Sequence, residues 1–177
     1  VISANIHSPV SGDIADIVEH SLPNGNKVKT VIIANDFQNK QEKLVKRELN
    51  DLKLIKKEEI FSIIKEAGIV GLGGAQFPTH VKYDIKFRKV DTLIINGAEC
   101  ESYLTSDYSV MKNHTKEIIN GLKVTQKLLN PKEVVIGIEE ENRELVEVVE
   151  EMGRKEKFQI KVKLLPTIYP QGSELQL

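Results

Sequence analysis

The residues best suited to chemistry lie in a glycine-rich loop over residues 68–79. Four of the chain's 11 glycines fall between positions 68 and 74. Glycine lets the backbone adopt positive φ and lets a flat or anionic ligand come close, and successive amide N–H groups can then cradle a phosphate. A flexible connection is the alternative, but loose linkers rarely carry such apolar residues between their glycines. We therefore expect a ligand-binding loop here.

This loop differs from the familiar nucleotide-binding motifs. A Walker loop needs a lysine after its last glycine, whereas Gly73 is followed by Gly74. The dinucleotide fingerprint needs a third glycine where Gln76 stands, with a strand before the loop and a helix after it. The sequence instead predicts a helix before the loop and a strand after it. The loop is therefore neither an ordinary Walker loop nor an ordinary Rossmann loop.

A second polar loop, over residues 96–107, follows an apolar stretch that is typical of a buried strand. Loops at the carboxyl ends of parallel strands form the usual ligand crevice of α/β sheets. Asn96 could bond the edge of a heterocycle, and Glu99 and Glu101 could bind ribose hydroxyls. Carboxylates that simply face water explain this stretch equally well. The acidic run over residues 139–141 precedes a predicted helix start, where negative charge is stabilising, and we expect it to be solvated.

Composition excludes several other chemistries. Cys100 is the only cysteine, so neither an internal disulfide nor a cluster held by four thiolates can form within the chain. The four histidines are scattered, and no Ser/His/Asp or Cys/His constellation is present, so we predict no metal site and no catalytic side chain. A net charge of -1 does not favour nucleic acid as a partner. Since there is no long apolar run, we expect no direct membrane insertion.

The spacing of apolar residues predicts the elements that position these loops. Residues 1–36 indicate short strands with a hairpin turn at 23–26, and residues 37–57 form a charged linker. The elements expected after that are a helix over 58–67, a strand over 91–96, a long helix over 108–129, a strand over 134–138, a helix over 145–152 and a half-exposed edge strand over 158–164. Strands separated by helices of this length predict a parallel α/β sheet flanked by helices, over residues 58–177.

Four stretches, in order along the chain, resemble the RnfC family of electron-transport subunits. Residues 71–82, GLGGAQFPTHVK, are similar to the flavin loop of the family, and residues 90–101, VDTLIINGAECE, to its next segment. Residues 169–177, YPQGSELQL, resemble its Tyr-Pro-Gln-Gly segment, and residues 6–12, IHSPVSG, the end of the barrel-sandwich domain that precedes the flavin domain. The proline-reductase-associated relatives of RnfC fit the same motifs. The resemblance implies a partial barrel-sandwich segment over 1–36 and a domain over 58–177 like the FMN-binding domain of respiratory complex I.

The resemblance also implies a chemistry. In this family NADH stacks on bound FMN and passes a hydride to it, and electrons then leave singly to iron–sulfur clusters. Such a site needs no acid–base triad, because the flavin carries the reaction. The cluster-binding cysteine motifs lie further along the family's proteins, so we expect this chain to be a segment of a longer NADH-dependent flavin oxidoreductase. The implied partners are NADH and other subunits of an electron-transfer complex, in the cytoplasm or peripheral to the inner face of the cell membrane.

The resemblance also implies cofactor-binding roles for the residues at matching positions. The resemblance places Gly71, Gly73, Gly74 and Ala75 along the flavin, Lys82 and Asn96 in hydrogen bonds to it, Phe77, Glu99 and Glu101 nearer NADH, and Gly172 and Glu174 at the same cleft from the last segment.

Three positions depart from the related pattern. Gln76 stands where complex I subunits have glycine, Ala98 where they have an acidic residue that helps to hold flavin, and Ser102 where a proline is common in the family. Gln76 and Ala98 favour an alternative hypothesis, a docking or scaffold module that keeps the fold without flavin. A third hypothesis, a carrier domain with a modified lysine, rests on the likeness of residues 8–12 to lipoyl and biotinyl domains.

Overall fold

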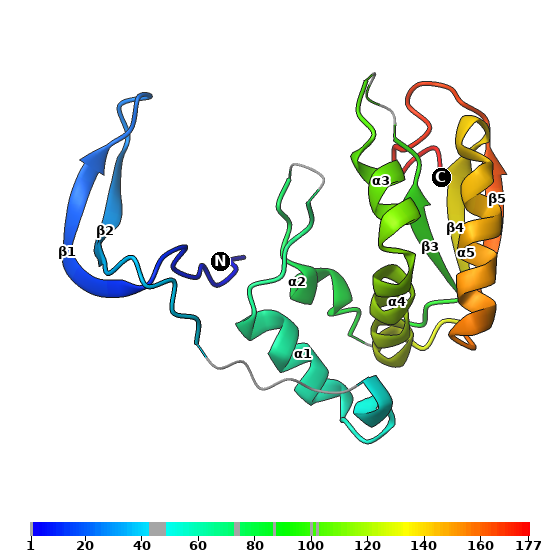
Figure 1. The fold of residues 1–177 in the computed structure, drawn as a ribbon, viewed down its shortest axis with the longest axis horizontal. Coiled ribbons are helices and arrows are strands. Elements are labelled where there is room, and N and C mark those ends of the chain that lie inside the picture. The colour runs from blue at the N-terminus through cyan, green and yellow to red at the C-terminus, as the bar shows by residue number, and fades with distance from the viewer. Residues whose placement is uncertain (1, 43–48, 73–74, 87, 100, 102) are drawn as a thin grey trace.

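The computed structural model describes residues 2–42, 49–72, 75–86, 88–99, 101 and 103–177. Its N-terminal part is an antiparallel two-stranded hairpin, and its C-terminal part is a three-stranded parallel sheet with helices (Figure 1). The predicted class, a parallel α/β sheet preceded by an all-β segment, is confirmed.

The hairpin consists of β1 (Gly12–Ser21) and β2 (Lys27–Asn35). Its turn lies where the sequence predicted it, with the Leu22 amide donating to the Asn26 carbonyl oxygen at 2.8 Å. Apolar side chains remain exposed, since the cross-strand partners Ile17 and Val31 are 59% and 50% exposed. An isolated hairpin of two strands is marginal in water, and these apolar side chains gain little burial from the two strands alone.

The sheet contains β3 (Thr92–Gly97), β4 (Glu133–Glu139) and β5 (Lys161–Leu165), in the order β3-β4-β5. All pairs are parallel, with Asn96 opposite Gly137. β5 lies at an edge, as its alternating pattern predicted.

Three helices, α3 (Ser106–Asn113), α4 (Thr115–Leu129) and α5 (Glu144–Lys155), cover one face of this sheet (Figure 1). Their apolar sides pack with alternate strand residues into a core whose most buried members are Ile119, Ile136, Ile138 and Leu145. On the strand β3, Ile94 points away from this core and is 49% exposed.

The long helix predicted over 108–129 is in fact two helices, which is a correction to the sequence analysis. His114, with φ −126° and ψ 30°, separates α3 from α4. The hydroxyl of Thr115 donates to the carbonyl oxygen of Met111 across the break. Apolar spacing continues through the break, so periodicity alone could not reveal it, whereas a side-chain bond to the backbone competes locally with the helical pattern.

Helix α1 (Lys57–Glu66) packs against α4 and ends as predicted before Gly68, whose φ is +64°. The glycine-rich loop leads from there into a short helix, α2 (Thr79–Tyr83), and not directly into a strand as the sequence predicted. Five residues are too few to produce a helical period. Two short 3-10 helices, Leu49–Lys53 and Glu140–Asn142, complete the described elements.

Candidate functional site

The described part of the glycine-rich loop is a narrow hairpin. The Gly71 amide donates to the Phe77 carbonyl oxygen at 2.9 Å, and the Thr79 amide donates to that of Ile69 at 2.9 Å. Ala75 is exposed and Phe77 is 39% exposed. The predicted flavin residues Gly73 and Gly74 lie outside the described residues.

Lys82 stands against the base of this loop. A Cβ added at Gly71 would lie 2.8 Å from Lys82 Nζ, closer than real side chains allow, so a glycine leaves the room that the ammonium group occupies. The Tyr83 hydroxyl, 3.0 Å from Thr125 Oγ1, ties α2 to α4. The loop and α2 therefore hold a cation beside a glycine-lined backbone, an arrangement suited to an anionic group.

Asn96 lies at the carboxyl end of β3 and joins two of the sequence motifs. Its Nδ2 donates to the Gly172 carbonyl oxygen at 2.7 Å, and its Oδ1 accepts a hydrogen bond from the Ala98 amide at 3.1 Å. Both polar atoms of this amide therefore have partners within the chain. The residue shapes the site by fixing the last segment against β3.

Glu99 turns its carboxylate toward the first turn of α3. It accepts hydrogen bonds from the Ser106 amide at 3.0 Å, the Ser106 hydroxyl at 2.8 Å and the Asp107 amide at 3.3 Å. Partial burial favours the neutral acid, but these bonds and a longer one from the Tyr108 amide outweigh it, so the pKa of Glu99 lies below its usual range. Glu99 thus caps the helix in this structure.

The acidic run over residues 139–141 was expected to be solvated, but Glu139, at the end of β4, is buried. Its side chain is buried, with 2% of the residue exposed, while Glu140 and Glu141 are exposed. Its Oε2 accepts a hydrogen bond from the Glu99 amide at 3.3 Å. Burial raises the pKa of Glu139 above its usual range; that hydrogen bond offsets part of the rise, and the charges of Glu141 and Glu99 add to it.

A cleft of about 410 Å³ opens across these strand ends, and we call it the carboxyl-edge cleft. Its lining combines carboxylates with aromatic rings, chiefly those of Glu99, Glu101, Glu139, Glu141, Tyr108 and Tyr169. The volume suits a small-molecule group. Sequence reasoning found Glu99 and Glu101 and expected the last segment at the cleft through Gly172 and Glu174. It missed Glu139 of β4 and Tyr169, which only the parallel topology brings to this edge.

The predicted site residues therefore fall into two groups. Gly71, Phe77 and Lys82 belong to the glycine-rich loop and α2. Asn96 and Gly172 are hydrogen-bonded to each other, and Glu99 and Glu101 line the carboxyl-edge cleft. Glu174 is exposed on the last segment.

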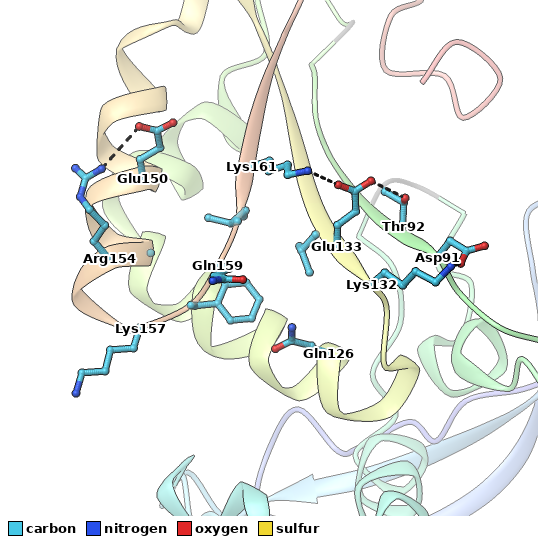
Figure 2. A pocket seen from close by; sticks show the side chains of 14 residues that line it. Asp91, Thr92, Gln126, Lys132, Glu133, Glu150, Arg154, Lys157, Gln159 and Lys161 are labelled. Carbon is cyan, nitrogen blue, oxygen red and sulfur yellow. Dashed lines mark hydrogen bonds and ion pairs between the residues drawn. The ribbon is translucent and has the colours of Figure 1, made fainter.

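A larger cleft, of about 960 Å³, lies at the opposite edge, where the strands begin (Figure 2). Its cations are largely neutralised by neighbours, with Lys161 Nζ 2.6 Å from Glu133 Oε2 and Lys132 Nζ 2.6 Å from Asp91 Oδ1. Because ligands of α/β sheets bind at the carboxyl ends of the strands, the smaller cleft is the better candidate.

The described residues offer neither a metal site nor a membrane-spanning helix. No group of three or more His, Cys, Asp or Glu among them could hold a metal ion. None of the helices in this part of the chain is long and apolar enough to cross a membrane.

Comparison with known families and proteins gives matches along the chain. Residues 64–177 match the family described as the Nuo51 FMN-binding domain, and residues 1–38 match the RnfC barrel sandwich hybrid domain. The chain is 37% identical over 177 residues to a subunit of the proton-translocating ferredoxin:NAD(+) oxidoreductase complex of Clostridium ljungdahlii, covering 99% of this chain and 38% of that protein. It is 36% identical over 178 residues to a subunit of the Na(+)-translocating ferredoxin:NAD(+) oxidoreductase complex of Acetobacterium woodii, covering 99% of this chain and 40% of that protein. The chain thus spans about two fifths of the length of these relatives.

Solved structures support the fold. A chain of an NAD+-reducing [NiFe]-hydrogenase in the air-oxidized state superimposes with a TM-score of 0.59, at 19% sequence identity, over 71% of this chain and 26% of that one. The same enzyme type in the H2-reduced state gives a TM-score of 0.61 at 20% identity, over 67% of this chain and 23% of that one.

Proposed function

The chain belongs to the Nuo51 FMN-binding domain family and is the N-terminal region of an RnfC-family protein, and from this premise we propose that it binds FMN and NADH as an electron-transfer oxidoreductase domain. A bound FMN would supply hydride acceptance from NADH and onward release of single electrons to iron–sulfur clusters elsewhere in the longer protein. The chain's own residues would bind and orient both molecules. Other subunits of an ion-translocating complex would be its protein partners.

The observation that carries this proposal is the contact between Lys82 and the glycine-rich loop. Lys82 Nζ, the flexible end of its side chain, lies beside Gly71, where a Cβ would approach it to 2.8 Å. Backbone amides and an ammonium group together favour an anion such as the phosphate of FMN. These residues fit the cofactor that the family is described as binding.

The other residues take complementary roles in this proposal. Gly73, Gly74 and Ala75 would lie along the flavin, and the half-exposed ring of Phe77 would contribute an apolar surface. Glu101, which lines the carboxyl-edge cleft, would accept hydrogen bonds from NADH. Glu174 would approach the same cleft from the last segment.

The remaining residues of this proposal act by holding the walls of the cleft. Asn96 and Gly172 keep the last segment in place, and Glu99 keeps α3 in place.

A docking module without flavin is the second candidate function. Ala98 is 6% exposed, so its small side chain is packed at the position where an acidic flavin-binding residue is expected in complex I subunits. Gln76 adopts a positive φ of 49° at the loop, with a side chain that a glycine would lack. Both features are compatible with a domain that serves the assembly of a complex without binding flavin.

A titration of the purified chain with FMN, followed by flavin fluorescence and then by anaerobic addition of NADH, tests the proposal. We expect saturable binding and loss of the oxidised flavin absorbance band when NADH is added. Binding without loss of that band would remove the NADH half of the proposal. A well-folded chain that does not bind FMN would support the docking module.

A further inference from the structure

A buried carboxyl group of the carboxyl-edge cleft has no role in the function proposed above. Glu139 ends the central strand β4, which is paired on both sides, and its own backbone pairs with Leu165 of β5. With 2% of the residue exposed, the side chain cannot exchange its protein contacts freely for water. It lines the carboxyl-edge cleft together with residues of the loop that connects β3 with α3.

This side chain is connected to that loop by one hydrogen bond. Glu139 Oε2 accepts from the Glu99 amide at 3.3 Å, and the Glu99 carboxylate in turn accepts from the Ser106 and Asp107 amides at the start of α3. The chain of bonds runs from the end of β4 to the loop and then to the helix. Glu101, two residues beyond Glu99, lines the same cleft.

We propose that Glu139 is a positioning residue of the carboxyl-edge cleft, which anchors the loop between β3 and α3 to the end of β4 and so sets where Glu99 and Glu101 stand. The anchoring follows from contacts within the chain. Its effect on a ligand rests on the proposed function, because the ligands concerned are FMN and NADH.

The surroundings of Glu139 make this anchor sensitive to pH. Glu99 and Glu101 line the cleft from the loop, Glu141 from the turn after β4, Tyr108 from α3 and Tyr169 from the segment after β5. Asp107, in the first turn of α3, interacts with Glu99 and has a pKa raised by burial and by the Glu99 charge. None of the described residues that line the cleft is a lysine or an arginine. As the pH rises through the raised pKa of Glu139, a negative charge appears beside those of Glu99 and Glu141. The ionised carboxylate is the better acceptor for the Glu99 amide, but its repulsion of the anionic NADH weakens NADH binding.

Three variants separate positioning from a general effect of charge. Glu139→Gln keeps an oxygen acceptor of nearly the same shape but cannot ionise. Glu139→Leu removes the acceptor at similar size. Glu140→Gln removes one charge from the exposed neighbour and is the matched control.

The first readout needs no cofactor. Amide hydrogen exchange of the FMN-free chain should be faster at Glu99 in Glu139→Leu by on the order of tenfold, and unchanged in Glu139→Gln and Glu140→Gln. The Glu99 amide nitrogen shift in the original chain should show a titration above the usual glutamate range, which is absent in Glu139→Gln. The carboxyl group of Glu99 itself titrates below that range, whereas burial and the charge of Glu99 raise the pKa of Asp107. The event that Glu139→Gln removes is therefore the one that belongs to Glu139.

The second readout is NADH affinity against pH for the FMN-loaded chain. It should weaken with rising pH in the original chain and in Glu140→Gln, and be flat in Glu139→Gln. Unchanged Glu99 exchange in Glu139→Leu, or an upper titration of the Glu99 amide that is the same in Glu139→Gln as in the original chain, would overturn the positioning role. If neither FMN nor NADH binds at all, the proposed function fails while the cofactor-free readout still decides the role of Glu139.

Discussion

The side-chain amide of Asn96 bridges the carboxyl end of β3 and a segment 76 residues later in the chain. Its Nδ2 donates to the Gly172 carbonyl oxygen at 2.7 Å, while its Oδ1 accepts from the Ala98 amide at 3.1 Å. One residue thus holds both the second polar loop and the last segment. The shape of the carboxyl edge depends on this pair of bonds.

Two replacements of Asn96 should distinguish the contributions of its two hydrogen bonds. Asn96→Asp keeps an acceptor for the Ala98 amide but places a second acceptor against the Gly172 carbonyl oxygen. Asn96→Ala removes both bonds. Since a hydrogen bond contributes about 1 kcal/mol net, we expect Asn96→Ala to lower the free energy of unfolding by about 1–2 kcal/mol in urea titrations. Faster amide exchange at Ala98 should follow in Asn96→Ala only, and equal exchange in the two variants would contradict the assignment.

Gly97 should tolerate no side chain. A Cβ there would lie 2.6 Å from the Gly137 carbonyl oxygen and 2.9 Å from Met111 Sδ, and the backbone of β4 cannot move aside cheaply. We expect Gly97→Ala to cost about 1–3 kcal/mol of stability, measured by thermal or urea unfolding. Gly121→Ala is the control, because open space surrounds that exposed position on α4, and it should stabilise the chain by about 0.5–1 kcal/mol. A loss of stability at both positions would point to a general intolerance of glycine replacement.

Stability in acid should depend on Glu99. Its pKa in the folded chain is lowered from 4.5, so its ionised form stabilises the fold at pH values above that figure. This contribution is lost as the pH falls through the lowered pKa, because the neutral carboxyl group is a weaker acceptor for the first amides of α3. Unfolding free energies measured across the acid range should therefore fall less steeply with decreasing pH in Glu99→Gln. Parallel curves for the variant and the original chain would exclude this role, and Glu140→Gln controls for the loss of one charge.

Local patterns predicted much of the fold. The apolar run at residues 93–95 and the alternation that ends in Leu164 identified strands, and helical spacing identified α1 and α5. Gly68 was expected to end a helix and adopts φ +64° at that place. These features depend on neighbours within a few residues, which is why sequence reasoning reached them.

Other features depend on contacts that the sequence does not reveal. Residues 139–141 are all glutamates, yet Glu139 at the end of the paired strand is buried and the next two residues are exposed. The partner of Asn96 lies 76 residues away, so no local pattern could identify it. Lys82 was predicted from the resemblance alone, and its contact with Gly71 depends on the short helix α2, which has too few residues to show a period.

Binding of FMN at the glycine-rich loop is the central claim, and calorimetric titration of Gly71→Ala with FMN tests it most directly. The added methyl would lie 2.8 Å from Lys82 Nζ, the flexible end of a side chain, so the fold should survive while the ammonium group is displaced. We expect FMN affinity to fall on the order of tenfold in Gly71→Ala, and to stay unchanged in the matched control Gly121→Ala. Equal affinity in Gly71→Ala, Gly121→Ala and the original chain would contradict the claim that this loop binds the cofactor.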